Sequence, residues 1–245
     1  MANSEITYLG KTLLIVNNEI GKKIVVIGDL HLGYEESLNR SVVFIGRKMF
    51  DELLSDLENV FRKTGRVDEI ILLGDVKHNF SENLKQEWND VLELIDYLGK
   101  KTSKIVIIRG NHDNYLKTIV GKMKNVSVSD YSLFSDCAFL HGDRDVEEIW
   151  ENKEIKRVIV GHGHPAIRIS DGTKTEKYKC FLVGRYKGKE MIIVPSFAEF
   201  YEGTDVRERS LGLVWELDYN KFEVLVVDKE NLKGLDFGKL GKIEN

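Results

Sequence analysis

The chain has 245 residues, of which 42% are hydrophobic and 31% are charged, and its formal net charge is −4 at pH 7. This length allows one large α/β domain or two small ones, and the negative charge argues against nucleic-acid binding through a global basic surface. No apolar run approaches the roughly 18–20 residues of a membrane span, and no N-terminal signal pattern is present. We therefore expect a cytoplasmic protein that does not enter a membrane.

The first half of the chain alternates between segments typical of strands and segments typical of helices. In chain order, the sequence predicts a strand pair within 6–17, a strand at 22–28, a helix over 43–63, a strand near 70–74, a helix over 84–99 and a strand near 104–109. The helices are indicated by apolar residues at helical spacing, and the strands by short runs rich in Val, Ile and Leu. The order β-α-β-α-β is typical of parallel strands with helical crossovers.

The second half is rich in strands. It predicts strands near 131–141, 157–160, 166–170, 178–187, 190–195, 211–217 and 222–228, with one short helix around 145–153. No linker rich in Pro, Gly or Ser separates the halves. We therefore expect a single domain over residues 1–245, of the α/β (α+β) class, in which a second sheet is stacked on the first and helices lie outside.

All six histidines follow the ends of five short apolar runs. These runs lead into Asp29 and His31, into Asp75 and His78, into Asn111, His112 and Asp113, into His141, and into His162 and His164. In open α/β sheets, ligands bind outside the carboxyl ends of the strands. If all five motifs lie at one edge of the sheet, we expect them to form a single ligand-binding site.

These residue types are typical ligands of divalent metal ions. Two carboxylates, an asparagine and several imidazoles suit Mn²⁺, Fe²⁺, Zn²⁺ or similar ions, and the two cysteines, Cys137 and Cys180, fall in apolar stretches where we expect core positions. The set is too large for one tetrahedral zinc but suits two metals that share a bridging carboxylate. Two such ions, about 3.5–4 Å apart, can hold the attacking and leaving oxygens of phosphoryl transfer.

The charge balance of such a site favours a phosphate ester. Two divalent ions, the carboxylates of Asp29 and Asp75 and a bridging hydroxide together leave one net positive charge, which attracts an anionic substrate. Asn111 fits this balance, because an aspartate in its place would neutralise the centre.

The motifs Asp-x-His, Gly-Asp, Gly-Asn-His-Asp, His-Gly and Gly-His-x-His, in this order, resemble those of the calcineurin-like metallophosphoesterases. The resemblance spans residues 28–164 and, more loosely, the whole chain. It implies a four-layer αββα sandwich, in which two stacked mixed sheets are flanked by helices.

The resemblance also implies roles for the individual residues. Asp29, His31 and His164 would hold the first metal, Asn111, His141 and His162 would hold the second, and Asp75 would bridge them. His112 would stabilise the phosphoryl oxygens or protonate the leaving oxygen, with Asp113 fixing its imidazole. The expected cofactor is a pair of divalent ions, with Mn²⁺ preferred over Fe, Zn or Ni.

His78 points to a subclass. A histidine three residues after the bridging aspartate, together with the segment Asp29–Gly33 (DLHLG), is similar to SbcD-type repair nucleases, their small archaeal relatives and the phosphoesterases associated with DNA ligase. There, the second histidine orients the scissile phosphodiester; the alternative is a loop residue hydrogen-bonded nearby. Because the chain ends at Asn245, we do not expect the DNA-capping region or the ATPase attachment of the repair nucleases.

Other residues have two interpretations. Asp143 either orients His141 or belongs to a turn, and Tyr34 and Tyr201 either stack on a base or, in the preferred interpretation, pack ordinarily. The resemblance places the segment 195–205 near the rim of the site. We interpret a group of basic residues around an expected hairpin at Lys187-Gly188 as a solvated strand face: Lys177, Lys179, Arg185, Lys187 and Lys189.

The preferred functional hypothesis is an Mn²⁺-dependent phosphodiesterase that acts on a nucleic acid strand or nucleotide, by attack of a metal-bridging hydroxide and with His112 assisting the leaving group. Its partner would be a phosphodiester substrate such as single-stranded DNA or a nucleotide; the sequence does not tell whether it has protein partners. The enzymatic alternative is a small-molecule phosphatase or a cyclic-nucleotide phosphodiesterase. A non-catalytic scaffold with the same fold is the third hypothesis.

Overall fold

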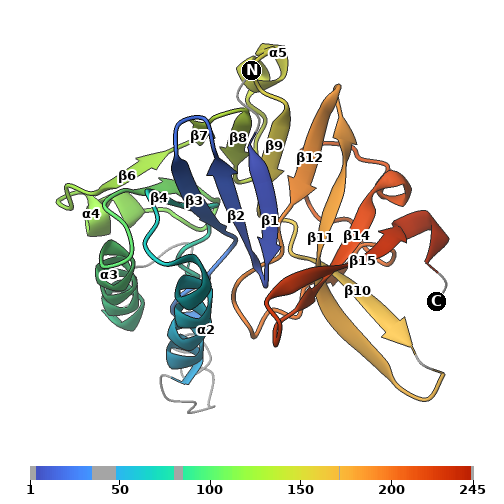
Figure 1. Cartoon of the computed structure of the whole chain (residues 1–245). Helices are drawn as coiled ribbons and strands as arrows, with labels where there is room; N and C mark the ends of the chain where they lie inside the picture. The colour runs from blue at the N-terminus through green and yellow to red at the C-terminus, as the bar shows by residue number, and fades with distance from the viewer. Residues whose placement is uncertain (1–3, 35–47, 80–84, 171, 244–245) are drawn as a thin grey trace.

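The computed structural model describes residues 4–34, 48–79, 85–170 and 172–243. Two mixed β-sheets are stacked face to face, and helices α2 (Lys48–Thr64) and α3 (Lys85–Gly99) cover the outer face of the first sheet (Figure 1). The expected helical residues 43–47 and 84 lie outside the described residues. Among the described residues, no helix combines the length and hydrophobicity needed to span a bilayer.

The first sheet has the strand order β1-β2-β3-β4-β5-β6. Its strands are β1 (Glu5–Leu9), β2 (Thr12–Asn17), β3 (Lys22–Ile27), β4 (Glu69–Leu72), β5 (Ile105–Ile108) and β6 (Val126–Ser129). Strands β3 to β6 are parallel, whereas β1 and β2 are antiparallel to their neighbours. The parallel arrangement brings the motifs that follow β3, β4 and β5 to one edge of the sheet.

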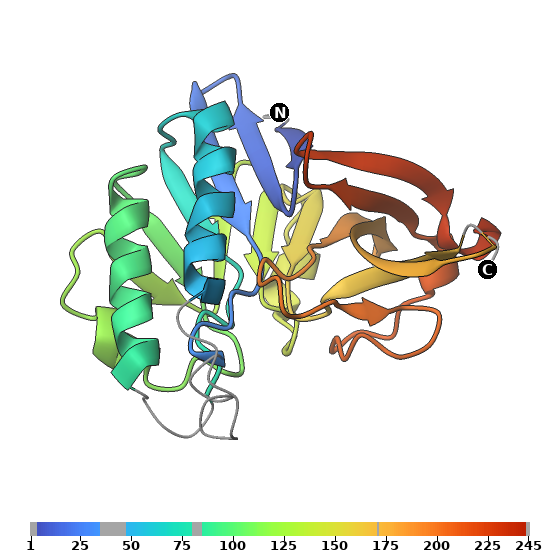
Figure 2. The same ribbon diagram turned by 90° about the horizontal axis from the view of Figure 1, so that it is seen from below.

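The second sheet has the order β13-β10-β11-β12-β9-β8-β7, and β14 and β15 join it beside β11. Its strands are β7 (Tyr131–Phe134), β8 (Cys137–Leu140), β9 (Arg157–Val160), β10 (Pro165–Ser170), β11 (Thr175–Tyr186), β12 (Lys189–Ile193), β13 (Thr204–Asp205), β14 (Glu223–Asp228) and β15 (Lys233–Lys239). Strands β8, β9 and β12 are parallel. The hairpins β10–β11 and β14–β15 extend away from the helices (Figure 2).

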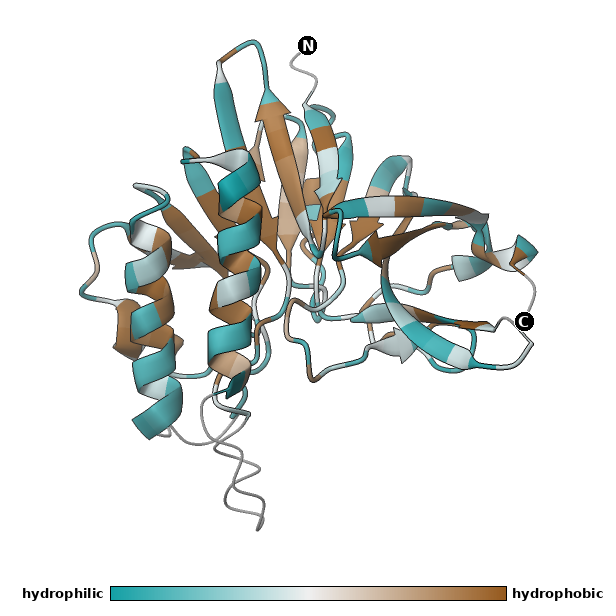
Figure 3. Cartoon of the chain, turned by 60° about the horizontal axis from the view of Figure 1, so that its bottom comes forward, coloured by the Kyte–Doolittle hydropathy of each residue, from teal (hydrophilic) through white to brown (hydrophobic). Residues whose placement is uncertain are grey.

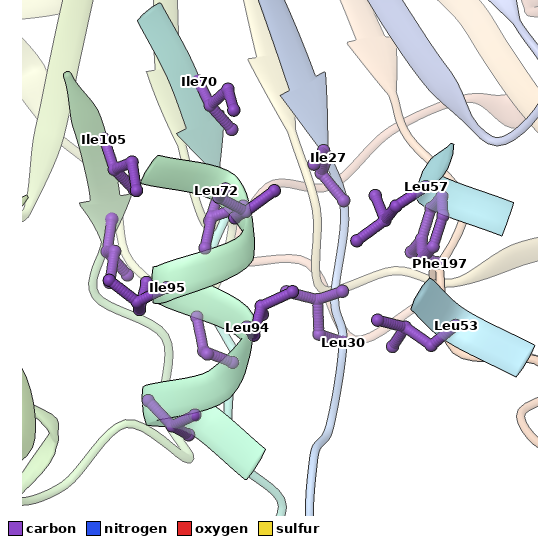
Figure 4. Close-up of a cluster of buried hydrophobic side chains, with 14 of the residues drawn as sticks. Ile27, Leu30, Leu53, Leu57, Ile70, Leu72, Leu94, Ile95, Ile105 and Phe197 are labelled. Atoms are coloured by element: carbon purple, nitrogen blue, oxygen red, sulfur yellow. The ribbon is translucent and has the colours of Figure 1, made fainter. Parts of the chain in front are cut away.

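Alternate residues of the central strands contribute to two different cores. In β3, Val25 and Ile27 pack against the helices, whereas Ile24 and Val26 pack against the second sheet. Burial on both faces explains why these strands are continuous apolar runs in the sequence. The central strands are accordingly hydrophobic along their length, whereas α2 and α3 carry polar residues on their outer sides (Figure 3). The inner sides of the helices contribute Leu53, Leu57, Leu94 and Ile95 (Figure 4).

The expected fold class is confirmed, but the outer face of the second sheet is covered differently from the first. It carries the short helix α5 (Glu147–Glu151) and an irregular segment that contributes Leu211 and Trp215 to the outer core. The expected strand at 211–217 is wrong: the apolar alternation is real, but Gly212 has a φ of +72°, and this part of the chain forms no strand. Strand β15 was not expected, because its residues are mostly exposed and two of them are glycines.

The interpretation of the basic residues around β11 and β12 as a solvated face is wrong for two of them. Lys179 and Lys189 are each only 7% exposed, and their ammonium groups donate to backbone carbonyl oxygens. The expected hairpin at Lys187-Gly188 is confirmed, since both residues have the positive φ of a tight turn.

Candidate metal centre

The five motifs of the sequence meet at one end of the two stacked sheets. Asp29, Asp75 and Asn111 follow β3, β4 and β5 of the first sheet, whereas His141 and His162 follow β8 and β9 of the second. The backbone N–H of His162 donates to both carboxylate oxygens of Asp29, at 3.1 Å each. His141 Nδ1 donates to the carbonyl oxygen of Leu73 at 2.7 Å. Site residues themselves thus link the two sheets.

Asp29, His31 and His164 form the first group of potential ligands. His31 Nε2 lies 3.3 Å from His164 Nε2, and His164 Nε2 lies 3.2 Å from Asp29 Oδ1. Asp29 and His31 are buried, and His164 is partly buried. These are the three residues that the resemblance assigns to one metal.

Asp75, His141 and His162 form the second group, and Asn111 lies beside it. His141 Nε2 is 3.1 Å from His162 Nδ1, 3.2 Å from Asn111 Oδ1 and 3.5 Å from Asp75 Oδ1. These are the residues that the resemblance assigns to the other metal, together with the bridging aspartate.

The Asp75 carboxylate lies between the two groups. Its Oδ1 is 3.5 Å from His141 Nε2 in the second group, and its Oδ2 is 3.9 Å from His31 Nε2 in the first. One oxygen therefore faces each group, which is the arrangement that a bridging carboxylate requires.

The residues present fit divalent cations. Two ligand atoms bound to one cation at about 2.0–2.2 Å lie about 2.8–3.6 Å apart, depending on the coordination angle. The five separations given above, from 3.1 to 3.5 Å, fall in this range, and all ligand atoms of each three-residue group lie within 4.8 Å of one another. The donors are imidazole nitrogens and carboxylate or amide oxygens, which suit borderline and hard divalent ions. Both groups are therefore able to bind divalent metal ions.

Backbone strain is concentrated at these ligands. Eight non-glycine residues have a positive φ among the described residues, and four of them are His31, Asp75, His162 and His164. Such conformations cost on the order of 1 kcal/mol or more each and persist where the surroundings impose them, typically at functional sites. The fold thus holds these four residues in strained backbone conformations, which set the directions of their side chains.

Two motif glycines make room for the ligands. Gly74 has a φ of +99°, and a Cβ there would lie 2.6 Å from His141 Nδ1. A Cβ at Gly110 would overlap Asp75 Oδ1. The glycines of Gly-Asp and Gly-Asn-His-Asp are therefore needed because ligand side chains approach the backbone closely.

Electrostatics favour the metal-binding protonation states of Asp29, Asp75 and His31. Burial alone would raise the pKa of Asp29, but His164 and His141 beside it hold that pKa well below its usual range. Burial would likewise raise the pKa of Asp75, and the hydrogen bond from His141 lowers it. Burial lowers the pKa of His31 to about 3, so this imidazole is neutral at pH 7. Ionised carboxylates and a neutral imidazole are the ligand forms. Burial alone would lower the pKa of His141, but the carboxylates of Asp75 and Asp29 raise it to about 9, so this imidazole must lose a proton to bind a metal.

His78 and His112 lie beside the ligands. His112 Nδ1 is 2.5 Å from the carbonyl oxygen of His78, and its Nε2 is 3.8 Å from Asp75 Oδ2. The two rings are nearly parallel, with centroids 5.8 Å apart. Together with His31 they form a third group of closely spaced donors. Both residues predicted to act on the phosphoryl group are therefore next to the predicted metal ligands.

The role expected for Asp113 needs correction. Its carboxylate accepts the backbone N–H groups of Val76 and Gly110, at 2.9 Å each, and that of Lys77 at 3.4 Å. The His112 ring is hydrogen-bonded to the carbonyl oxygen of His78, where we expected Asp113. Asp113 therefore joins the loops after β4 and β5. Burial raises its pKa to about 6.

Asp143 does not orient His141. The Nδ1 of His141 is hydrogen-bonded to the Leu73 carbonyl oxygen, whereas Asp143 pairs with the Arg144 guanidinium at 2.9 Å. The turn interpretation of Asp143 fits this arrangement.

Glu87 is a functional candidate that the sequence analysis missed. It lies on α3 and is fully buried, and its Oε1 accepts the backbone N–H groups of His78 and Asn79, at 2.9 and 2.8 Å. The buried ammonium of Lys77 lies 3.8 Å from its Oε2. A Cβ at Gly33 would lie 2.6 Å from Glu87 Cβ, which explains the glycine of the DLHLG segment. The signal in the sequence was a glutamate on the same helical face as Val91 and Leu94.

Two aromatic rings adjoin the histidines, and a third packs against them. The ring centroid of Tyr201 is 4.7 Å from that of His31, and the centroid of Tyr34 is 4.9 Å from that of His78. Phe200, which the sequence analysis did not single out, stacks on Tyr34 with centroids 4.1 Å apart. The segment 195–205 thus reaches the rim of the site through Phe200 and Tyr201, as expected.

One family model and one solved structure agree with this architecture. The family model described as calcineurin-like phosphoesterase matches residues 22–166. Nuclease MPE from Pseudomonas putida has a similar structure, with a TM-score of 0.59 and 16% sequence identity, over 95% of this chain and 100% of that chain. Wild-type Vps29 from Entamoeba histolytica in complex with Zn²⁺ matches with a TM-score of 0.36 and 14% identity, over 88% of this chain and 98% of that chain. No curated protein matches the sequence.

The family match begins at β3 and extends to the start of β10, so it includes all five motifs and the strands that carry them. It covers more than half of the chain. The chain belongs to the calcineurin-like phosphoesterase family.

Proposed function

We propose that this protein is a binuclear metal-dependent phosphodiesterase that acts on a nucleic acid strand or a nucleotide, with Mn²⁺ as the working metal. The observation that carries the proposal is the pair of ligand groups that meet at Asp75, with two further imidazoles beside them. Two adjacent cation sites and nearby proton donors are the combination that phosphoester hydrolysis requires.

The cations, when bound, would activate a water molecule and neutralise the phosphoryl oxygens. Asp29 and Asp75 stay ionised beside the imidazoles and limit the positive charge of the centre. His112 is oriented by its Nδ1 contact with the His78 carbonyl oxygen. With Nδ1 donating to that oxygen, Nε2 faces the ligand cluster. In the imidazolium form of His112, Nε2 also carries a proton, which it can donate to the leaving oxygen, leaving the neutral Nδ1–H imidazole. His78 supplies a second imidazole for the oxygens of the same phosphate.

The surroundings of the two imidazoles support the proposed substrate class. A phosphodiester carries an organic group on each side of the phosphate. The ring of Tyr34 contacts that of His78, and the ring of Tyr201 contacts that of His31. Aromatic side chains are common binding surfaces for nucleic acid bases. The Pseudomonas putida protein of similar fold is a nuclease, which supports testing nucleic acid first.

The proposal is tested by comparing substrates after reconstitution of metal-free protein with Mn²⁺. We expect bis(4-nitrophenyl) phosphate and end-labelled single-stranded DNA to be hydrolysed faster than 4-nitrophenyl phosphate or cyclic AMP. Asp75→Asn should abolish hydrolysis, whereas the matched control Asp143→Asn should retain it, because the Asp143 carboxylate pairs with the Arg144 guanidinium and not with a predicted ligand. Faster monoester cleavage would favour a small-molecule phosphatase, faster cyclic AMP cleavage a cyclic-nucleotide phosphodiesterase, and no metal-dependent hydrolysis a scaffold.

A further inference from the structure

An aromatic cluster, formed by Tyr34, Phe200 and Tyr201, lies against the imidazoles that would contact the substrate phosphate. Tyr201 is in ring contact with His31 and His164, with centroids 4.7 and 5.4 Å away, and its hydroxyl oxygen is 3.5 Å from His78 Nδ1. The Phe200 centroid lies 4.7 Å from that of Tyr201. The cluster therefore begins at the metal ligands and continues away from them.

The rings of this cluster are partly exposed, unlike the core aromatics next to them. Phe197, three residues before Phe200, is buried between α2 and the first sheet at 1% exposure. Phe200 and Tyr201 retain intermediate exposure, as does Tyr34. Aromatic surface left open beside a charged centre fits a flat ligand that is apolar on its faces and attached to an anion.

The segment that carries Phe200 and Tyr201 is held rigidly. The buried ammonium of Lys179 donates to Ser196 O and Ser196 Oγ, at 2.8 and 2.9 Å, and that of Lys11 donates to Phe197 O at 2.8 Å. The backbone N–H of Phe197 donates to the carbonyl oxygen of Asp29 at 2.8 Å. A metal ligand and two buried lysines thus fix the position of the cluster relative to the centre. A preorganised surface costs little ordering entropy when a ligand binds.

We propose that the aromatic cluster is a stacking subsite for the nucleobase of a nucleotide ester whose phosphate is bound at the metal centre. The proposal rests on the proposed function and adds where the nucleoside lies. Tyr201 is the principal surface, because its ring contacts both His31 and His78. The rings of Tyr34 and Phe200 pack against the ring of Tyr201. Stacking is tolerant of base identity, so the subsite favours nucleosides over simple alkyl groups without selecting a sequence.

Two substrates with the same leaving group test this subsite. Thymidine 5′-(4-nitrophenyl phosphate) and methyl 4-nitrophenyl phosphate differ only in the second alcohol on the phosphate, which is the nucleoside thymidine in one and methanol in the other. The readout is the ratio of their kcat/KM values in Mn²⁺-loaded protein. The wild-type ratio should exceed one, and Tyr201→Leu should lower it about tenfold, since stacking on one aromatic side chain changes affinity by roughly 5- to 150-fold. Tyr201→Phe should keep the ratio, because it keeps the ring.

The matched control is Tyr178→Leu, which removes a 37% exposed tyrosine on β11 outside the site and should leave the ratio unchanged. An unchanged ratio in Tyr201→Leu, or an equal loss in Tyr201→Phe and Tyr201→Leu, would overturn the stacking role. If wild-type protein cleaves neither ester, the proposed function itself is refuted.

A measurement on wild-type protein covers the case in which Tyr201→Leu fails to fold. The fluorescence of 2-aminopurine ribonucleoside 5′-monophosphate should be quenched on binding, and thymidine 5′-monophosphate should reverse the quenching. Methyl phosphate at the same concentration should reverse it at least about fivefold less effectively. Binding of the 2-aminopurine nucleotide without quenching, or equal competition by methyl phosphate, would contradict the subsite.

Discussion

The backbone N–H of His162 donates to both oxygens of the Asp29 carboxylate, at 3.1 Å each. Asp29 follows β3 in the first sheet and His162 follows β9 in the second, so one hydrogen-bonded pair joins the sheets between two predicted ligands of different metals. The carboxylate has two functions in this arrangement: it offers charge to the first group of ligands and fixes the loop that carries the second. Loss of Asp29 should therefore affect both groups.

We expect Asp29→Asn and Asp29→Ala to separate these two functions. Both variants should lose metal at the first group, because the carboxylate charge is gone. Only Asp29→Ala leaves the partly buried His162 N–H without its acceptor, which costs about 1 kcal/mol or more of the free energy of unfolding. Urea unfolding of the metal-free variants and elemental analysis of the metal-loaded ones measure the two effects. Equal stabilities of the two variants would show that the link between the sheets contributes little.

His112→Asn should retain the metals but lose most of the turnover. No predicted ligand is removed, and proton transfer by a positioned imidazole typically contributes about 10²- to 10⁴-fold to a rate. The measurements are kcat for a phosphodiester and the metal content of the same preparation. A loss of metal in parallel with activity would instead make His112 a ligand.

Glu87→Ala should disturb the His78 loop without removing a predicted ligand. The variant removes the acceptor of two buried N–H groups and leaves the ammonium of Lys77, which is 0% exposed, without the nearby carboxylate. We expect a loss of about 3 kcal/mol of unfolding free energy and a fall in kcat at unchanged metal content. Glu87→Gln retains one acceptor oxygen and should restore most of the activity. If Glu87→Gln is as inactive as Glu87→Ala, the charge opposite Lys77 matters more than the position of His78.

Acid should weaken the ion pairs of Glu199, which help to hold the segment that carries Tyr201. Burial alone would raise the pKa of Glu199, but the ammonium groups of Lys11 and Lys229 lower it to about 2. A folded-state pKa below the unfolded value of 4.5 means that this carboxylate stabilises the fold above pH 4.5, and that the contribution is lost as the pH falls from 4.5 towards 2.

Glu199→Gln should therefore reduce the free energy of unfolding at pH 6 by on the order of 2 kcal/mol, and by much less at pH 3. Urea unfolding of metal-free protein at the two pH values measures the difference. Glu202→Gln is the matched control, since the Glu202 side chain is 77% exposed. Equal destabilisation of Glu199→Gln at both pH values would contradict the stabilising role of these ion pairs.

The sequence was sufficient to predict which residues the structure brings together, because the positions of the candidate ligands depend on the local order of the chain. Apolar runs such as that before Asp75 identify buried parallel strands, and parallel strands deliver the residues that follow them to one edge. The grouping of His31 with His164 and of Asp75 with His141 came from the family resemblance, and the distances agree with it. Strand order alone would not have separated the two groups.

What the sequence could not provide depends on contacts between distant segments. Glu87 is nine residues from His78 and on another element, and only the packing of α3 against Gly33 brings its carboxylate to the loop. The partner of the His112 ring was misassigned for a similar reason, because a backbone carbonyl carries no sequence signal. The segment around Trp215 has the apolar alternation of a strand but packs irregularly on the outer core.

The most direct test of the account is the number of Mn²⁺ ions that wild-type protein and Asp75→Asn hold, measured by isothermal titration and elemental analysis after removal of all metal. We predict two ions per chain in wild-type protein and weakened binding of both in Asp75→Asn, because the Asp75 oxygens face both groups of ligands. A single ion per chain, or two ions whose affinities Asp75→Asn leaves unchanged, would contradict a centre built around a shared aspartate.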